Sequence, residues 1–211
     1  MKLTHHLITN RRGFTLVELI IGMTIFVVGM TAILTLLNSA VSSSQRSKNE
    51  IIAANILREQ VELVKNIRNT NVRSFALWSS GIVPNLYTIE NDYSNSLTTY
   101  TNGIPTSGPV KMTTSTILQT DGLKDRFEKA RLYIDDKGRF THAITSTGSN
   151  IASYITITPL QFSRPAGTPL VLEPKDRDGN NQGYILDARV IINSSGFREY
   201  DLKTVITDWQ K

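Results

Sequence analysis

The sequence lacks cysteine altogether, and it lacks charge over a long stretch near its N-terminus. Without cysteine the protein has no disulfide framework, no thiolate zinc site and no cysteine nucleophile. Forty per cent of the 211 residues are apolar, which is enough to build a core and argues against global disorder. The formal charge of +5 suggests a nucleic-acid partner, but only if the basic residues gather on the folded part of the chain.

The uncharged stretch predicts a membrane span. Glu18 is the only charged residue between Arg12 and Arg46, and no proline occurs within residues 14–83. Residues 14–37 read FTLVELIIGMTIFVVGMTAILTLL. As a helix they would be about 36 Å long, against a hydrocarbon core of roughly 30 Å. The stretch is also longer than the ~7–15-residue apolar core of an ordinary secretory signal.

Basic residues before the span predict its orientation. Lys2, Arg11 and Arg12 favour a cytoplasmic location for residues 1–13, with the rest of the chain outside. Three of the 23 basic residues therefore belong to this leader. Its removal leaves 20 basic against 18 acidic residues, a net charge of +2. Most of the excess positive charge therefore serves to orient the membrane span. We expect membrane lipid, and not nucleic acid, as a partner.

The residues at the start of the span form a motif, Arg11-Arg12-Gly13-Phe14-Thr15-Leu16-Val17-Glu18. It resembles the processing site of type IV prepilins and of the related pseudopilins of type II secretion systems. The resemblance implies cleavage between Gly13 and Phe14 by an aspartyl prepilin peptidase, followed by N-methylation of Phe14. Glu18 would then occupy the family's acidic fifth position. Other pilin subunits and a pilus or secretion assembly platform are the further partners that the resemblance implies.

Physical chemistry supports each part of this motif. Gly13 carries no Cβ, so its backbone enters a protease cleft easily. A carboxylate at Glu18 costs about 2.5–3.5 kcal/mol at the centre of a bilayer, and somewhat less near the interface. Cleavage creates an α-amine at Phe14, and this cation can pair with Glu18 of a neighbouring subunit. Such a pair offsets much of the desolvation cost and sets the axial register of the two helices.

The helix is expected to continue beyond the span to residue 69. Apolar residues recur at three- and four-residue spacing from Ala53 to Ile67, which indicates one buried stripe, and Asn69-Thr70-Asn71 is expected to end the helix. The predicted organisation is a leader at 1–13, a membrane or filament-core half of the helix at 14–37, an amphipathic half at 38–69, and a head at 70–211.

The head is predicted to be a small antiparallel sheet that covers the helix stripe, so the fold class is α+β with the lollipop shape of pilins. Residues 91–108, rich in Ser, Thr, Asn and Gly, are expected to be a surface loop within a variable connection at 88–116. Alternating apolar residues predict strands near 131–144, 151–158, 184–192 and 200–206. Asn193-Ser-Ser-Gly196 is expected to turn the last hairpin.

A loop late in the chain resembles a calcium site. Asp176, Asp178, Asn180 and Asp187 place oxygen atoms at ligand positions 1, 3, 5 and 12. The match is imperfect, because Asn181 stands where an EF-hand has glycine and the last ligand is Asp in place of Glu. A polar hairpin loop rich in turn formers is the alternative. We expect no other cofactor.

The sequence contains no GxSxG, P-loop or HExxH motif, so we expect no enzyme. The favoured function is a structural subunit, most simply a minor one, of a type IV pilus-like filament in the bacterial cytoplasmic membrane, with the head outside. A minor pseudopilin of a type II secretion system is the alternative. A soluble module released by signal peptidase near Ala40 is a more distant one, and it would leave Glu18 unexplained.

Overall fold

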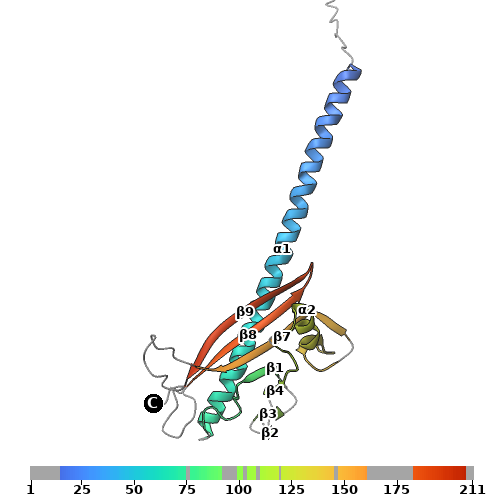
Figure 1. Ribbon diagram of the computed structural model, residues 1–211. Coiled ribbons are helices and arrows are strands. Elements are labelled where there is room, and N and C mark those ends of the chain that lie inside the picture. The colour runs from blue at the N-terminus through green and yellow to red at the C-terminus, as the bar shows by residue number, and fades with distance from the viewer. Residues whose placement is uncertain are drawn as a thin grey trace, which may run out of the picture. The chain divides into compact units, whose positions relative to one another are not determined.

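The computed structural model describes residues 15–74, 77–91, 99–101, 104–107, 110–118, 120–144, 147–160 and 183–207 (Figure 1). The chain divides into two compact units, residues 1–48 and 49–211. The fold class is α+β: one long helix is followed by an antiparallel sheet, as predicted.

Helix α1 runs without interruption from Leu16 to Arg73, 58 residues. Its described residues in the first unit are all exposed, whereas its second part is buried along one stripe. The helix extends two residues beyond the expected end at 69–71. Asn71 is 3 % exposed, and its amide donates to the carbonyls of Trp78 (3.2 Å) and Ser80 (2.6 Å). The asparagine therefore fastens the loop that follows instead of ending the helix.

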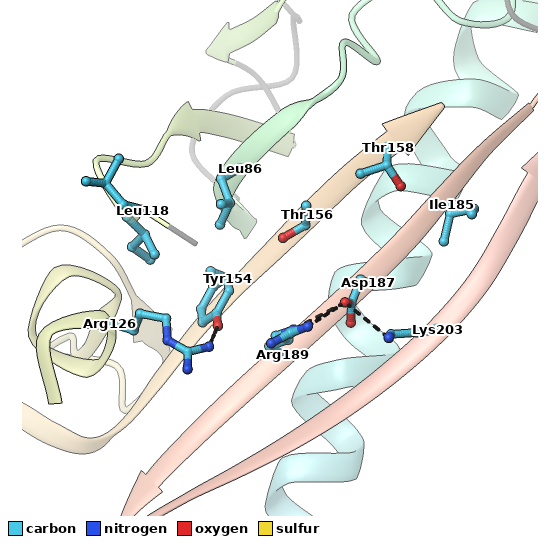
Figure 2. A pocket seen from close by; sticks show the side chains of 11 residues that line it. Leu86, Leu118, Arg126, Tyr154, Thr156, Thr158, Ile185, Asp187, Arg189 and Lys203 are labelled. Atoms are coloured by element: carbon cyan, nitrogen blue, oxygen red, sulfur yellow. Dashed lines mark hydrogen bonds and ion pairs between the residues drawn. The ribbon is translucent and has the colours of Figure 1, made fainter. Parts of the chain in front are cut away.

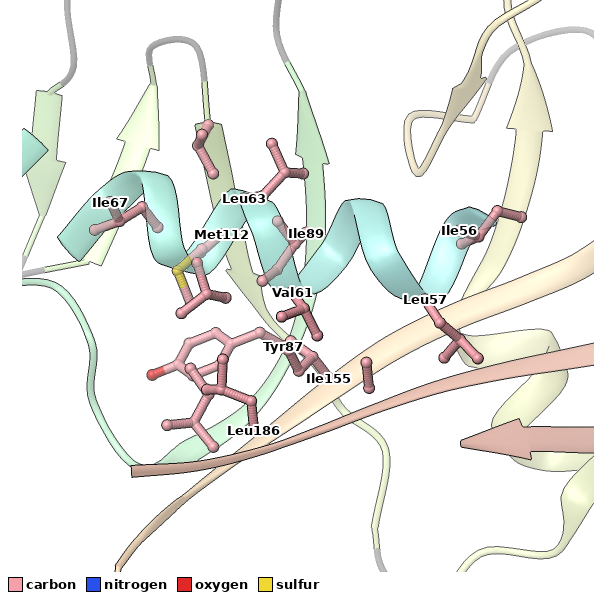
Figure 3. Packing of buried hydrophobic residues seen from close by; sticks show 14 of the residues in the cluster. Ile56, Leu57, Val61, Leu63, Ile67, Tyr87, Ile89, Met112, Ile155 and Leu186 are labelled. Carbon is pink, nitrogen blue, oxygen red and sulfur yellow. The ribbon is translucent and has the colours of Figure 1, made fainter. Parts of the chain in front are cut away.

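The stripe on the second part of α1 packs against one face of the sheet. Its buried apolar members are those that the spacing predicted, together with Val61: Ala53, Ile56, Leu57, Val61, Leu63, Val64 and Ile67. They share one cluster with Tyr87, Ile89, Met112, Ile155 and Leu186 of four strands, and Figure 3 shows Val61 directed at Tyr87 and Ile155. This cluster is the main core of the second unit.

Strand β7 (Thr147–Pro159) is the centre of the seven-stranded sheet. Strand β8 (Gly183–Asn193) pairs with β7 along one edge, and β9 (Phe197–Thr207) pairs with β8. The other edge of β7 is shared by β5 (Arg131–Ile134) and β1 (Asn85–Asn91). Strands β4 (Val110–Thr114) and β6 (Phe140–Thr141) pair with β1 and β5. All these pairings are antiparallel, and β7, β8 and β9 lie side by side in Figure 1.

The register divides the sheet into two faces. Tyr87, Ile155 and Ala188 lie in one cross-strand row and join the core under α1. The adjacent row, Leu86, Thr156, Asp187 and Lys203, faces the other way because strand side chains alternate. Helix α2 (Leu123–Lys129) covers part of this outer face, where Phe127 packs with Ala152, Tyr154 and Ile191.

Three parts of the head differ from the sequence prediction. The region expected as a variable loop contains the end of β1, β4, and a separate two-stranded sheet of β2 (Thr99–Thr101) and β3 (Ile104–Ser107). Val110 and Met112 explain β4, since they alternate into the main core. Helix α2 lies in a segment for which the sequence analysis predicted no element, and Phe127 anchors it. The β5–β6 hairpin is present, but its return strand is only two residues long.

Candidate functional site: the N-terminal end of helix α1

The first turn of α1 is closed by Thr15 and Glu18. The backbone N–H of Thr15 donates to Glu18 Oε2 (3.1 Å), and the Thr15 hydroxyl donates to the same oxygen (3.2 Å). In return the backbone N–H of Glu18 donates to Thr15 Oγ1 (3.3 Å). This reciprocal pattern is a capping box, which satisfies N–H groups that a helix start leaves unpaired. The negative charge also lies at the end of the helix dipole that favours an anion.

The capping box is a role of Glu18 that the sequence analysis missed. Its signal was present, since Thr15-Leu16-Val17-Glu18 has the T-x-x-E spacing of such a cap. The carboxylate thus acts within its own chain through Oε2. Within the described residues, no hydrogen bond is made by the second oxygen, Oε1. One carboxylate oxygen of Glu18 remains available for a group outside the chain.

The apolar residues that follow have no protein cover. Every large apolar side chain from Leu16 to Leu37 is at least 51 % exposed. These 22 residues rise about 33 Å as a helix, close to the thickness of a hydrocarbon core. In the part of the chain that the structure describes, α1 is the one helix long and apolar enough to cross a membrane by length and composition. So much exposed apolar surface indicates a lipid or protein partner.

Three threonines of this stretch donate their hydroxyl groups to backbone carbonyls of the same helix. Thr24 donates to the carbonyl of Ile20 (2.8 Å), and Thr31 donates to that of Val28 (2.8 Å). Thr35 donates to the carbonyl of Thr31 (2.9 Å). A hydroxyl paired within the helix needs no water, so these residues cost little in hydrocarbon. The polar side chains inside the span are therefore compatible with burial in lipid or among other helices.

The two glycines inside the span, Gly22 and Gly29, lie on the exposed helix surface with no neighbouring side chain in the described chain. A Cβ placed on Gly22 or Gly29 would meet nothing within 4 Å. The helix is nevertheless continuous through both positions. Gly13, Phe14, Lys2, Arg11 and Arg12 lie outside the described residues, so their predicted roles in processing and topology stay predictions.

Comparison with known families identifies this end of the chain. Residues 8–34 match the family model described as the prokaryotic N-terminal methylation motif. The chain carries the prepilin-type motif of type IV pilins and pseudopilins. No curated protein and no solved structure matches the chain. The motif covers the expected cleavage point, Glu18 and most of the exposed apolar stretch.

The prepilin motif indicates what the exposed apolar helix is for. The motif implies processing by prepilin peptidase and assembly with other pilin subunits. The matched motif is a structural, pilin-type motif and not the signature of an enzyme class. The apolar helix and the motif are consistent with a membrane-anchored, single-pass protein, in which lipid would cover the side chains that the described chain leaves exposed.

The predicted calcium loop is described at only one of its four positions. Asp176, Asp178 and Asn180 lie outside the described residues. Asp187 lies in β8, where its Oδ2 accepts from the Arg189 guanidinium (2.9 Å) and lies 3.7 Å from Lys203 Nζ. Among the residues that the structure describes, no group of three or more His, Asp or Glu could hold a metal ion. The calcium site stays a prediction.

A polar pocket in the head lies between α1 and the sheet. His142, just after β6, approaches Ser153 Oγ through Nε2 (3.4 Å), and burial lowers the pKa of His142 to about 4 although nearby Glu90 opposes the shift. Burial also raises the pKa of Glu90, but bonds from Thr141, His142 and Lys111 outweigh this and lower it overall. Gln60 of α1 borders the same small cavity of about 30 Å³. The shifted pKa values of His142 and Glu90 make the stability of the head depend on pH.

Proposed function

We propose that this chain is a structural subunit of a type IV pilus-like filament, made as a membrane-anchored precursor. Prepilin peptidase cleaves it between Gly13 and Phe14 on the cytoplasmic side, and Phe14 is methylated. The subunit then moves from the bilayer into the filament, where α1 packs among the helices of other subunits. The prepilin motif at the start of an uncovered apolar helix carries this proposal.

The exposed surface of α1 supports transfer between two apolar environments. The apolar side chains surround the helix, so lipid can cover all of its faces in the membrane. Helices of other subunits can replace the lipid in the filament, because the bonded threonines and the open glycine faces allow close packing. The same residues thus serve as anchor and as assembly surface.

Glu18 supports the proposal through its two oxygens. Oε2 caps α1, and Oε1 has no hydrogen bond within the described chain. In the filament the N-methylated amine of Phe14 from a neighbouring subunit binds this free oxygen. The pair neutralises both charges in a low-dielectric environment and sets the axial position of one helix against the next.

Sequencing the mature N-terminus tests the proposal. The expected result is N-methyl-Phe14 when the chain is produced with a prepilin peptidase, and an intact leader without the peptidase. Gly13→Ala should stay unprocessed, while the matched control Gly22→Ala should be processed normally, since its Cβ would meet nothing. A mature chain that begins after Ala40 would overturn the proposal.

A further inference from the structure

Strand β9 forms one edge of the sheet, and this edge is long and regular. In the part of the chain that the structure describes, β9 pairs with β8 alone, and it lies at the margin of the sheet in Figure 1. The pairing runs from Phe197 to Thr207 without a shift in register, and the strand contains no proline. An edge without a bulge or a proline presents a row of backbone N–H and C=O groups that can pair with a further strand.

The core is only half covered at this edge. Strand β8 contributes Leu186, Ala188 and Val190 to the core, and all three are fully buried. On β9, Leu202 stands opposite Ala188 and Tyr200 stands opposite Val190. These two side chains pack against the same core but stay partly exposed. A strand added beside β9 would remove their apolar surface from water, which favours the addition.

The opposite, outer face of β8 and β9 carries charges, and most of them are paired with one another. The Arg189 guanidinium donates to Asp187 Oδ2 (2.9 Å) and lies 3.4 Å from Glu199 Oε1. Lys203 lies 3.7 Å from Asp187, but its side chain is 60 % exposed. Asp201 stands opposite Arg189, is exposed, and makes no hydrogen bond or ion pair within the described residues. The exposed charges of the edge strand are therefore one acidic and one basic, two residues apart. Figure 2 shows the outer-face pocket beside them, which is lined by Arg126, Tyr154, Asp187, Arg189 and Lys203 among others.

These side chains define the strand that completes the edge. In an antiparallel addition, directly opposed side chains lie on the same face of the sheet, where opposite charges attract and like charges repel. An acidic residue opposite Lys203 and a basic residue opposite Asp201 match the outer face. An apolar residue between them lies opposite Leu202 on the core face. Read from its N-terminus, the added strand therefore has the order acidic, apolar, basic.

A second copy of the chain offers this order in its own β9, which reads Asp201-Leu202-Lys203. The other described edge strands, β2, β3, β4 and β6, contain Lys111 as their one charged residue. Antiparallel pairing of two β9 edges needs a two-fold axis perpendicular to the sheet, and this axis reverses the part of α1 that packs on it. Parallel pairing turns one sheet over and sets the charged row of one copy beside the apolar row of the other. Chains anchored in one membrane by the same helix point the same way, so the added strand comes from a different protein.

We propose that the edge of β9 from Tyr200 to Thr204 binds an extended strand of a partner protein, antiparallel to β9, with an acidic, an apolar and a basic residue in that order. Main-chain hydrogen bonds supply the affinity, and the charge pairs with Lys203 and Asp201 set the direction and register of the added strand. This inference rests on the proposed function, because anchoring in one membrane is what excludes a second copy. The edge thereby selects its partner by the order of side chains and not by net charge.

The test is an NMR titration of the full-length chain, at one chain per detergent micelle, with acetyl-Val-Glu-Val-Lys-Val-amide. This peptide places its Glu opposite Lys203 and its Lys opposite Asp201, and it should shift the backbone amides from Tyr200 to Thr204. The charge-swapped peptide, acetyl-Val-Lys-Val-Glu-Val-amide, has the same composition but opposes like charges, so it should bind about tenfold more weakly. The first peptide with every residue N-methylated cannot donate main-chain hydrogen bonds and should not bind.

Exchanging the two charges of the edge provides the matching change in the protein. The double variant Asp201→Lys with Lys203→Asp should bind the charge-swapped peptide more tightly than the first one. The control double variant, Asp136→Lys with Lys137→Asp in the exposed β5–β6 turn, should keep the wild-type preference. Each variant conserves the net charge, so a reversed preference reports the order of charges along β9.

Three results would overturn the inference: equal affinity of the wild-type chain for the two peptides, binding of the N-methylated peptide, or an unchanged preference in an edge variant with the wild-type melting temperature. Shifts of the same amides on concentrating the chain without peptide would overturn it too, by assigning the edge to a second copy. The filament proposal is tested separately by N-methyl-Phe14, so the edge can fail while the filament function stands.

Discussion

Glu18 combines two roles at one residue. It closes the first turn of α1 through Oε2, and it leaves Oε1 for a partner charge. A carboxylate close to an apolar span is tolerated because both the cap and the helix dipole stabilise it before any partner arrives. These two roles respond differently to substitution, which makes them separable by experiment.

Glu18→Ala should leave cleavage and methylation intact and should sharply reduce the amount of chain found in filaments, because the neighbouring amine loses its partner. Thr15→Val is the matched control. It removes the cap hydroxyl, at a cost of about 1 kcal/mol, but keeps the carboxylate. Immunoblotting of sheared filaments against membrane fractions measures both variants. Normal incorporation of Glu18→Ala would contradict the role given to Oε1.

Gln60 is a second residue whose behaviour follows from its surroundings. It is 2 % exposed, and neither polar atom of its amide has a hydrogen-bond partner among the described residues. An unpaired buried polar group costs about 1–3 kcal/mol. Gln60→Leu should therefore raise the melting temperature by roughly 2–4 °C per kcal/mol gained. Gln60→Ala, which removes the amide but leaves a cavity, should not, and thermal melts followed by circular dichroism compare the two.

At the scale of elements, α1 changes environment along its length while its backbone stays regular. Its first part is apolar on all sides and uncovered, and its second part has one buried stripe. The chain after the helix is held by a side chain of the last helical turn. Asn71 donates to two carbonyls of residues 78–80 and so joins the helix to the loop before β1.

Asn71→Ala should destabilise this junction. The substitution leaves the carbonyls of Trp78 and Ser80 without their donor, and one of these bonds is buried, so the expected loss is about 1–3 kcal/mol of unfolding free energy. Asn69→Ala is the control, because Asn69 is exposed and near the same helix end. Urea unfolding measures both. Equal stability of the two variants would show that Asn71 does not hold the loop.

At the scale of the whole molecule, stability depends on the pH through His142. Its pKa is lowered from 6.5 to about 4 by burial, which Glu90 and a hydrogen bond to the Arg131 backbone oppose. Glu59 borders the same cavity, and Lys111 is ion-paired with Glu90. Because the folded state holds His142 neutral, the unfolded state takes up its proton first as the pH falls.

The contribution of His142 is therefore fully present above pH 6.5 and is lost progressively between pH 6.5 and about 4. The loss can reach about 3 kcal/mol. The lowered pKa of Glu90 adds a further loss below its ordinary value of 4.5. His142→Gln should flatten the pH dependence of the melting temperature between 6.5 and 4, and an unchanged slope would contradict this assignment.

Sequence reasoning was most successful where one residue type decides the outcome locally. The apolar spacing from Ala53 to Ile67 predicted the stripe that the sheet covers. The alternation in β8 and β9 and the turn at 193–196 were also correct, and Gly196 has the positive φ (132°) that favours glycine. The loop prediction was wrong at β4. Val110 and Met112 stand in a short segment rich in polar residues, so their burial becomes evident only when β4 pairs with β1.

The sequence by itself determined the prepilin motif and the apolar helix, because a cleavage motif and a hydrophobic run are properties of consecutive residues. It also determined that the head is β-rich. The Glu18 cap was also readable from the T-x-x-E spacing, because a capping box joins residues three apart. Only the tertiary structure decided that Asn71 holds a loop and that Gln60 is buried without a hydrogen-bond partner among the described residues. The outer-face pocket likewise needs the folded sheet, since Arg126, Asp187 and Lys203 come from a helix and two strands. Such a site forms only when the register of the strands sets distant residues side by side.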